Sequence, residues 1–274
     1  MLPWNYGVHW TLGTTVFLGA FYTVMVVVIT TLISAVWRSR GSLQAGDAED
    51  VRWRSDFYAL PAAGRACRHQ LTGELECREC QRGFDCRECD THQTFLERRP
   101  PLGPAGTSYS AFGMTFPLDR LYHRGHTWVR RERNGTVTIG IDEFGRRLLG
   151  KPDSVELPRK GHRLRLHSTA WHMRKRSFDL GVVSPVAGTV VETGGPDVEW
   201  YLRVMPEQPD LRHLLEGFEV QLWVAHEMER LRKALSAWGA APDLVDGKTD
   251  FALIAASCPA GCWEAACSAV FLRS

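Results

Sequence analysis

No Lys, Arg, Asp or Glu occurs between Met1 and Trp37, and the first charged side chains are those of Arg38 and Arg40. The most apolar part of this stretch, residues 11–36, is long enough at about 1.5 Å per residue to cross a hydrocarbon core of about 30 Å as one helix. A buried helix of a soluble protein is seldom apolar on all sides over such a length. The absence of charge therefore predicts a transmembrane helix that anchors the chain to a lipid bilayer.

Aromatic side chains lie at both ends of this stretch, whereas arginines lie only at its C-terminal end. Trp4 and Trp10 precede its most apolar part and Trp37 follows it, as expected for rings in a headgroup layer. By the positive-inside rule, we expect a single-pass protein of the cell inner membrane, with its N-terminus outside and its C-terminal bulk in the cytoplasm. A cleaved signal peptide is the alternative, although such a peptide usually has a basic start, a shorter apolar core and a small-residue cleavage site.

The chain has little net charge and few lysines. Its 33 Lys and Arg residues against 31 Asp and Glu give a formal charge of +2, so we expect no nucleic-acid partner. Lysine occurs only at positions 151, 160, 175, 233 and 248. Chemistry that needs a lysine amine is therefore restricted to few positions.

Motifs typical of catalysis are also absent. The sequence contains no nucleophile elbow, no phosphate-binding glycine loop and no His-Glu-x-x-His, and isolated His, Ser and Asp residues are more often structural than catalytic. We expect no catalytic residues, no small-molecule substrate and a protein that is not an enzyme.

Five of the eight cysteines are concentrated between positions 67 and 89. Two Cys-x-x-Cys pairs are separated by a short turn, and such pairs can bring four sulfurs onto a tetrahedral ion without long-range folding. Zinc ribbons usually separate their pairs by more residues, so one cysteine of the first pair is treated as a spectator. The predicted ligands are Cys67, Cys80, Cys86 and Cys89, with Cys77, His69 and His92 as alternates.

Zinc is the expected metal at these cysteines. The segment is short, polar and glycine-containing, so that a bound metal would supply its folding energy, and a cytoplasmic location keeps the thiols reduced. An iron–sulfur cluster is the alternative metal centre. Disulfides or unligated thiols are a third alternative, favoured if the membrane topology is inverted.

A second group of cysteines lies near the C-terminus. Cys258, Cys262 and Cys267 have Cys-x₃-Cys and Cys-x₄-Cys spacing. We expect them to be mainly buried small residues of a C-terminal tail.

A strand-rich region follows a linker of prolines and glycines at residues 98–106. Within it, Asn134-Gly135 lies between two runs of strand-forming residues, which is a strong signal for a β-hairpin. Residues 142–149 then predict a short helix with Asp142 as its N-cap and Gly150 at its end. Further strands are predicted at residues 154–157, 163–168, 180–183, 189–192 and 200–204. We therefore expect a mainly β domain.

Several motifs of this region occur together: Tyr122-His-Arg-Gly-His-Thr-Trp-Val, Val137-Thr-Ile-Gly-Ile-Asp-Glu-Phe, Val155-Glu-Leu-Pro, Ser184-Pro-Val-Ala-Gly-Thr-Val-Val-Glu and Trp200-Tyr-Leu-Arg-Val. In order and spacing they resemble the glycine cleavage system H-protein family, a relative of lipoyl domains. The resemblance covers residues 122–217, about a third of the chain. It implies a flattened β-sandwich of the biotinyl/lipoyl type with flanking helices.

The resemblance also implies a lipoyl arm on one lysine at the tip of a β-hairpin, which shuttles an aminomethyl group between enzymes. Counted back from Ser184-Pro185, that position is Ser177 here, and the nearest lysine is Lys175. The family surrounds its lysine with acidic and small residues, whereas this hairpin is strongly basic. Lys175 is therefore the candidate lipoyl site, although lipoate is not expected. A solvated basic turn, or a loop that docks on acidic protein or lipid headgroups, are the alternatives.

The region after the predicted sandwich has apolar residues at helical intervals. The predicted helix covers residues 218–238, and its apolar face includes Leu222, Ala225, Met228, Leu231 and Leu235. We expect this helix to pack against the β domain of its own chain, with docking on a partner subunit as the alternative.

Taken together, these features predict four regions: an anchor at 1–40, a cysteine-rich segment and linker at 41–105, an H-protein-like domain at 106–217, and a helix with a tail at 218–274. The first hypothesis is an accessory or scaffold subunit that binds other membrane-protein subunits of a respiratory or photosynthetic electron-transfer complex. The alternative is a membrane-tethered lipoyl carrier that uses Lys175 together with a redox-active cysteine segment.

Overall fold

The computed structural model describes residues 11–45, 47–98, 108–175, 178–239, 251, 258–259 and 261–272. The chain divides into two compact units, Met1–Val51 and Arg52–Ser274. The predicted linker lies almost entirely outside the described residues. The predicted boundaries at 105/106 and 217/218 stay predictions.

The first unit contains helix α1 (Leu12–Ala45). Its part Leu12–Ser34 is apolar and long enough, at 23 residues, to cross a membrane. Most of its large apolar side chains from Leu12 to Ile33 are exposed. An apolar N-terminal helix, suited to a membrane span or to a signal sequence, is therefore present where the absence of charge predicts one.

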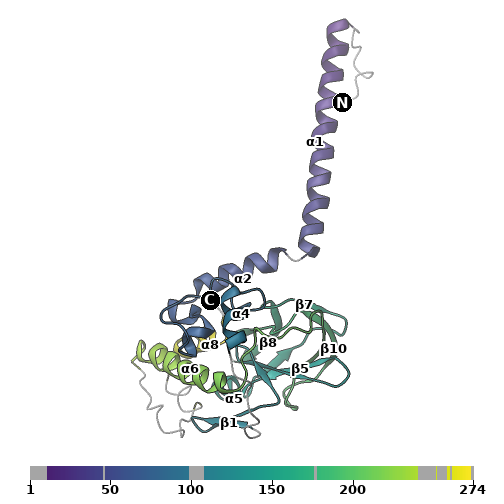
Figure 1. Cartoon of the computed structure of the whole chain (residues 1–274). Helices are drawn as coiled ribbons and strands as arrows, with labels where there is room; N and C mark the ends of the chain where they lie inside the picture. The colour runs from purple at the N-terminus through teal and green to yellow at the C-terminus, as the bar shows by residue number, and fades with distance from the viewer. Residues whose placement is uncertain are drawn as a thin grey trace. The chain divides into compact units, whose positions relative to one another are not determined.

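The second unit is built around two main sheets, whose strands are labelled in Figure 1. The six-stranded sheet has the order β3 (Leu121–Tyr122), β4 (Thr127–Arg131), β5 (Val137–Ile141), β11 (Leu202–Pro206), β10 (Gly188–Thr193) and β7 (Arg163–Leu164). The three-stranded sheet has the order β6 (Ser154–Glu156), β8 (Thr169–Lys175) and β9 (Phe178–Val183), and a separate ribbon pairs β1 (Ser108–Ala111) with β2 (Met114–Pro117). The strand pairs in the described residues are antiparallel.

The two main sheets share one hydrophobic core, as the β-sandwich prediction requires. Val129, Ile139 and Leu202 of the larger sheet and Trp171 and Leu180 of the smaller one belong to the same buried cluster. The rings of Trp171 and Tyr201 stack at 5.2 Å between centroids. The structure is thus sandwich-like and rich in sheet.

The local signals in the β domain correspond to the elements observed. Strands β4 and β5 pair from Thr127↔Ile141 to Arg131↔Val137, around the predicted turn. Gly135 has φ +80°, a conformation that glycine adopts readily, and Asn134 Oδ1 accepts the Thr136 N–H at 3.1 Å. Both residues therefore stabilise the turn as the Asn-Gly signal predicts.

Helix α5 (Glu143–Leu149) begins and ends as predicted. Asp142 Oδ1 accepts the Gly145 N–H at 2.7 Å, and Gly150 ends the helix with φ +66°.

Helix α6 (Phe218–Ser236) packs against α8 (Cys262–Val270), α3 (Arg68–Leu71) and β1, which confirms packing on its own chain (Figure 1). Part of the predicted apolar face is wrong, because Leu222 is 41% exposed and Ala225 is exposed too. The buried face instead follows Trp223, Val224 and Glu227 before it reaches Met228 and Leu231. A search for apolar residues alone misses this buried face, because Glu227 is part of it.

The cysteine-rich segment folds into short elements: η2 (Ala62–Arg65), α3 and α4 (Asp90–Arg98), preceded by α2 (Asp47–Ala59). A small apolar cluster of Phe57, Leu60, Phe84 and Leu272 holds part of it. Trp53 donates from Nε1 to the Gly83 carbonyl at 3.2 Å and stacks on His167 of the β domain at 4.4 Å. Packing onto the β domain therefore orders this segment in the structure.

Candidate functional site

Lys175, the candidate lipoyl site, is the last residue of β8 and not a turn residue. It pairs with Phe178, the first residue of β9. Both Arg176 and the family-equivalent Ser177 lie outside the described residues. The lysine is thus placed within the strand ladder.

The amine of Lys175 is engaged by the protein. Nζ donates to the carbonyl oxygen of Leu149 at the C-terminal end of α5, where helix carbonyls carry partial negative charge. It also lies 5.3 Å from the centroid of the Trp263 ring. Trp263 in turn donates from Nε1 to the Leu148 carbonyl at 3.2 Å and meets Phe178 edge-on at 5.7 Å.

These contacts do not fit a lipoyl arm on Lys175. A lipoyl arm is attached to the lysine through an amide bond, and this bond removes the charge of the amine. The arm must also project into solvent. Here the half-buried ammonium group is held between a helix C-terminus and an aromatic ring. The contact with Trp263 could not be predicted from the sequence near the hairpin, because Trp263 lies 88 positions after Lys175 (263 − 175).

The basic character of the hairpin is partly neutralised by neighbouring acidic residues. Arg174 contacts Glu156 of β6 at 3.1 Å and Asp179 of β9 at 3.7 Å. His172 Nδ1 lies 3.1 Å from the Asp179 carboxylate. Strand pairing therefore places the acidic residues Glu156 and Asp179 beside the basic hairpin, and neither belongs to residues 172–177.

A backbone bridge brings two of the predicted metal ligands to neighbouring positions. Ala66 and Glu79 form an antiparallel bridge, with Cys67 N donating to Arg78 O and Cys80 N to Arg65 O, each at 2.8 Å. Cys67 and Cys86 are buried, and Cys80 and Cys89 are half-buried.

The alternate Cys77 is instead exposed. Its role as a spectator stays a prediction.

Burial favours the protonated thiol at two of these cysteines, Cys67 and Cys86. Burial raises the pKa of Cys67, and the neighbouring Cys80 and Cys89 sulfurs raise it further. Burial likewise raises the pKa of Cys86 to about 12. Within the described residues, no group of three or more His, Cys, Asp or Glu side chains is arranged to hold a metal ion. The described residues therefore show no metal site in the cysteine-rich segment.

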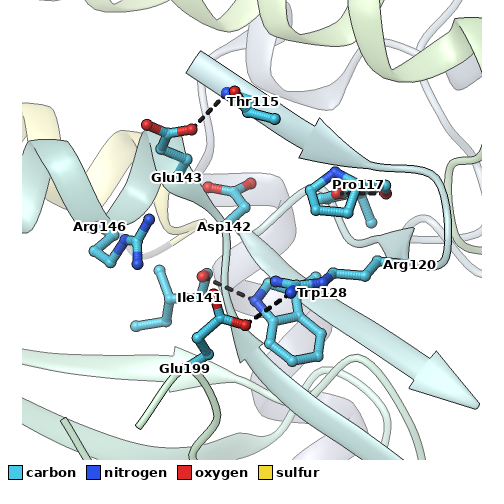
Figure 2. Close-up of a pocket in the computed structure, with 10 residues that line it drawn as sticks. Thr115, Pro117, Arg120, Trp128, Ile141, Asp142, Glu143, Arg146 and Glu199 are labelled. Atoms are coloured by element: carbon cyan, nitrogen blue, oxygen red, sulfur yellow. Dashed lines mark hydrogen bonds and ion pairs between the residues drawn. The ribbon is translucent and has the colours of Figure 1, made fainter. Parts of the chain in front are cut away.

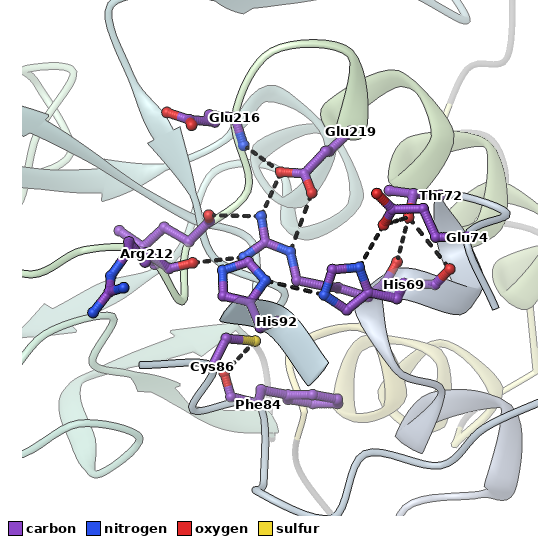
Figure 3. Close-up of polar contacts among 11 residues, drawn as sticks. His69, Thr72, Glu74, Phe84, Cys86, His92, Arg212, Glu216 and Glu219 are labelled. Atoms are coloured by element: carbon purple, nitrogen blue, oxygen red, sulfur yellow. Dashed lines mark hydrogen bonds and ion pairs between the residues drawn. The ribbon is translucent and has the colours of Figure 1, made fainter. Parts of the chain in front are cut away.

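The two alternate histidine ligands contact each other. His69 Nε2 lies 3.0 Å from His92 Nδ1, and His69 Nδ1 is paired with the Glu74 carboxylate. Figure 3 shows these three side chains in one row. Both ring nitrogens of His69 are thus used within the protein, which leaves His69 without a free nitrogen for a metal.

Next to this row, Arg68 connects the cysteine-rich segment to the start of α6. Its Nε donates to Glu219 Oε1 at 3.2 Å and its Nη2 to Glu219 Oε2. The carbonyls of Arg212 and Leu214 accept from Nη1 at 2.6 Å and Nη2 at 3.1 Å, and the Glu216 N–H donates to Glu219 Oε2 at 3.1 Å (Figure 3). Arg68 is 4% exposed and Glu219 1%, so this is a fully desolvated, hydrogen-bonded ion pair.

A second buried charge network lies between the β domain and α6. His126 Nδ1 lies 2.9 Å from Asp142 Oδ2, and Nε2 lies 3.8 Å from Glu227 Oε2. Glu227 also accepts from Arg230 Nη1 at 2.6 and 2.7 Å. Burial alone would lower the pKa of His126, but Asp142 and Glu227 outweigh it and raise this pKa to about 9. The imidazole is therefore protonated at neutral pH and joins the two elements.

A cavity of about 190 Å³ opens between β2, β4 and α5 (Figure 2). It is lined by Thr115, Pro117, Arg120, Tyr122, Trp128, Ile141, Asp142, Glu143, Arg146 and Glu199. Arg120 lies over the Trp128 ring at 4.1 Å and donates to Glu199 at 2.9 Å. The cavity is smaller than the roughly 300–1,000 Å³ of usual small-molecule sites, and its charges are of both signs.

The C-terminal cysteines are partly as expected. Cys262 is 1% and Cys267 0% exposed, which confirms burial of these two. Cys258 is only half-buried, and its sulfur contacts that of Cys262. The Cys-x₃-Cys spacing was the sequence signal for this pair.

Comparison with known proteins agrees with the sequence motifs. Residues 120–196 match the family model of the glycine cleavage H-protein. The glycine cleavage system H protein of Neisseria meningitidis serogroup C is 31% identical over 106 residues, covering 34% of this chain and 83% of that protein. That of Thiobacillus denitrificans is 30% identical over 128 residues, covering 42% and 98%. A crystal structure of the Mycobacterium marinum H protein aligns with 38% of this chain and 94% of its own, at 21% identity and a TM-score of 0.34. This chain belongs to the glycine cleavage H-protein family.

Proposed function

We propose that this protein is a membrane-anchored accessory subunit whose H-protein-like domain carries no lipoyl arm and acts as a scaffold on the cytoplasmic face of a larger membrane complex. A respiratory or photosynthetic electron-transfer complex is the proposed host. The observation that carries the proposal is the engagement of Lys175, the lysine nearest to the family's lipoyl position, by Leu149 and Trp263. Like H proteins, the domain would not be a catalyst.

The way the cysteine-rich segment joins the β domain supports a scaffold. The buried pair of Arg68 and Glu219 and the stack of Trp53 on His167 connect parts of the chain that are far apart in sequence. A unit held together in this way presents a fixed surface to a neighbouring subunit, because opening it would leave buried charges unpaired.

The intact denatured mass of the chain purified from its native membrane tests the proposal. A covalent lipoyl group survives denaturation, so an unmodified mass is expected for a scaffold. A lipoyl-sized addition mapped to Lys175 would overturn the proposal and favour a membrane-tethered lipoyl carrier. In that case Lys175→Arg would abolish the addition and the carrier activity.

Gentle extraction tests the proposed partners. The protein should co-purify with other membrane proteins in fixed stoichiometry, whereas a well-behaved lone monomer would contradict the accessory role. Reporters fused to each end test the orientation. A C-terminal reporter that works only in the cytoplasm should be active, whereas C-terminal reporter activity outside the cytoplasm would contradict this orientation.

A further inference from the structure

The sulfurs of Cys258 and Cys262 lie 2.6 Å apart. Even carbon atoms, which are smaller than sulfur, settle at about 3.5–4.0 Å when they are not bonded. Both cysteines are free thiols in the structure. Among the described residues, no other two cysteine sulfurs make such a contact, so this pair stands apart from the five cysteines at positions 67–89.

The local backbone holds the two thiols together. Cys262 is the first residue of α8, and Gly261 before it has φ +87°, a left-handed conformation that glycine adopts without strain. The Cys262 N–H donates to the Pro259 carbonyl at 3.1 Å. The Cys258 sulfur thus lies against the first residue of the helix, within the reach of a disulfide.

The two thiols differ in accessibility. Cys258 is half-buried, whereas Cys262 is 1% exposed. Thiol–disulfide exchange needs one accessible sulfur that meets the partner and a second that resolves the mixed disulfide. The pair provides both roles in one loop.

We propose that Cys258 and Cys262 form a reversible dithiol–disulfide couple that exchanges with the disulfide of an aliphatic thiol. Cys258, after loss of its proton, attacks one sulfur of the partner disulfide, and one partner thiolate leaves. Cys262 then loses its proton and displaces the second partner thiolate from Cys258. Two thiols of the protein are oxidised to one disulfide, and the partner disulfide is reduced to two thiols that carry the two protons.

The couple lies beside the carrier-type hairpin of the fold. Trp263, the residue after Cys262, contacts both Lys175 at the end of β8 and Phe178 at the start of β9. Redox exchange at α8 would thus occur next to this strand pair. This activity goes beyond the proposed scaffold role and does not depend on it.

Full-length protein in detergent tests the couple, with oxidised glutathione as the probe. After reduction, exposure to oxidised glutathione should remove two hydrogens from the peptide that contains Cys258, Cys262 and Cys267, and fragmentation should place the bond between Cys258 and Cys262. The same loss should persist in Cys267→Ala, which keeps both members of the pair.

Single variants separate the two roles. Cys262→Ser should trap glutathione on Cys258, because the resolving thiol is missing, whereas Cys258→Ser should leave Cys262 largely unmodified. Glutathionylation of the exposed Cys77 shows that the reagent is active. If Cys77 is modified while Cys258 and Cys262 stay free, or if Cys267→Ala abolishes the bond, the proposal is overturned.

Discussion

Arg68 and Glu219 lie 151 positions apart in the chain, and their side chains form a buried ion pair with two hydrogen bonds. One residue belongs to the cysteine-rich segment and the other to the first turn of α6. The pair therefore joins the region before the β domain to the helix that follows it.

Replacing Arg68 should strongly destabilise the protein. Arg68→Ala leaves the Glu219 carboxylate buried and unpaired, which costs about 3–5 kcal/mol, measurable by denaturant unfolding of the full chain in detergent. Arg232→Ala is the matched control, because Arg232 pairs with Glu229 at the exposed surface of the same helix, where loss of an ion pair changes stability little. Equal costs for the two variants would contradict a structural role of the buried pair.

Stability should fall as the pH rises above neutrality. The pKa of His126 is about 9 in the folded protein, above its ordinary value of about 6.5. Between these values the folded state binds more protons than the unfolded state, so unfolding becomes easier as pH rises. The stabilisation is fully present below about pH 6.5 and is lost through about pH 9, by roughly 2–4 kcal/mol.

Unfolding free energies measured from pH 6.5 to 9.5 check this expectation. His126→Gln cannot carry the charge, and its stability should be lower at pH 7 and should decline much less over the same range. A wild-type stability that rises over this range would show that His126 is neutral in the folded protein.

Lys175 should react slowly with amine-acylating reagents. Its ammonium group is held by Leu149 and Trp263, whereas Lys160 is exposed. We expect severalfold slower acylation of Lys175 than of Lys160, measured by peptide mass spectrometry. Trp263→Leu should raise the rate at Lys175 and leave Lys160 unchanged. Equal acylation rates of Lys175 and Lys160 in the wild-type protein would mean that the Lys175 amine is free.

Metal binding by Cys67, Cys80, Cys86 and Cys89 stays a proposal. Zinc would have to displace the thiol protons, so metal content should fall as the pH is lowered. We expect about one zinc per full-length chain, with loss in Cys80→Ser and retention in Cys77→Ser, since Cys77 is exposed. A protein with neither zinc nor iron, and with all eight cysteines titratable, would end the metal hypothesis.

Local signals predicted much of the β domain. The Asn134-Gly135 turn and the caps of α5 act over a few residues, so that short-range patterns report them well. The strands β1 to β3 were not predicted, because they are short and follow a proline- and glycine-rich stretch. The strand predicted at residues 163–168 is only Arg163–Leu164 in the structure.

The buried face of α6 shows why the candidate site was harder to predict. Glu227 lies on the apolar stripe because His126 and Arg230 compensate its charge. Such compensation comes from residues in other elements or on the next turn, and burial of a charge is favourable only once all partners are in place.

The sequence by itself determined the uncharged N-terminal helix, the H-protein motifs and the presence of Ser177 where the family has its lysine, since each depends on residue type and short spacing. Only the tertiary structure decided that Lys175 is held by Leu149 and Trp263, that Arg68 meets Glu219, and that Cys258 touches Cys262. These contacts depend on packing: they form when distant segments, or a turn and the helix after it, are placed together, and no periodicity of the chain encodes that placement.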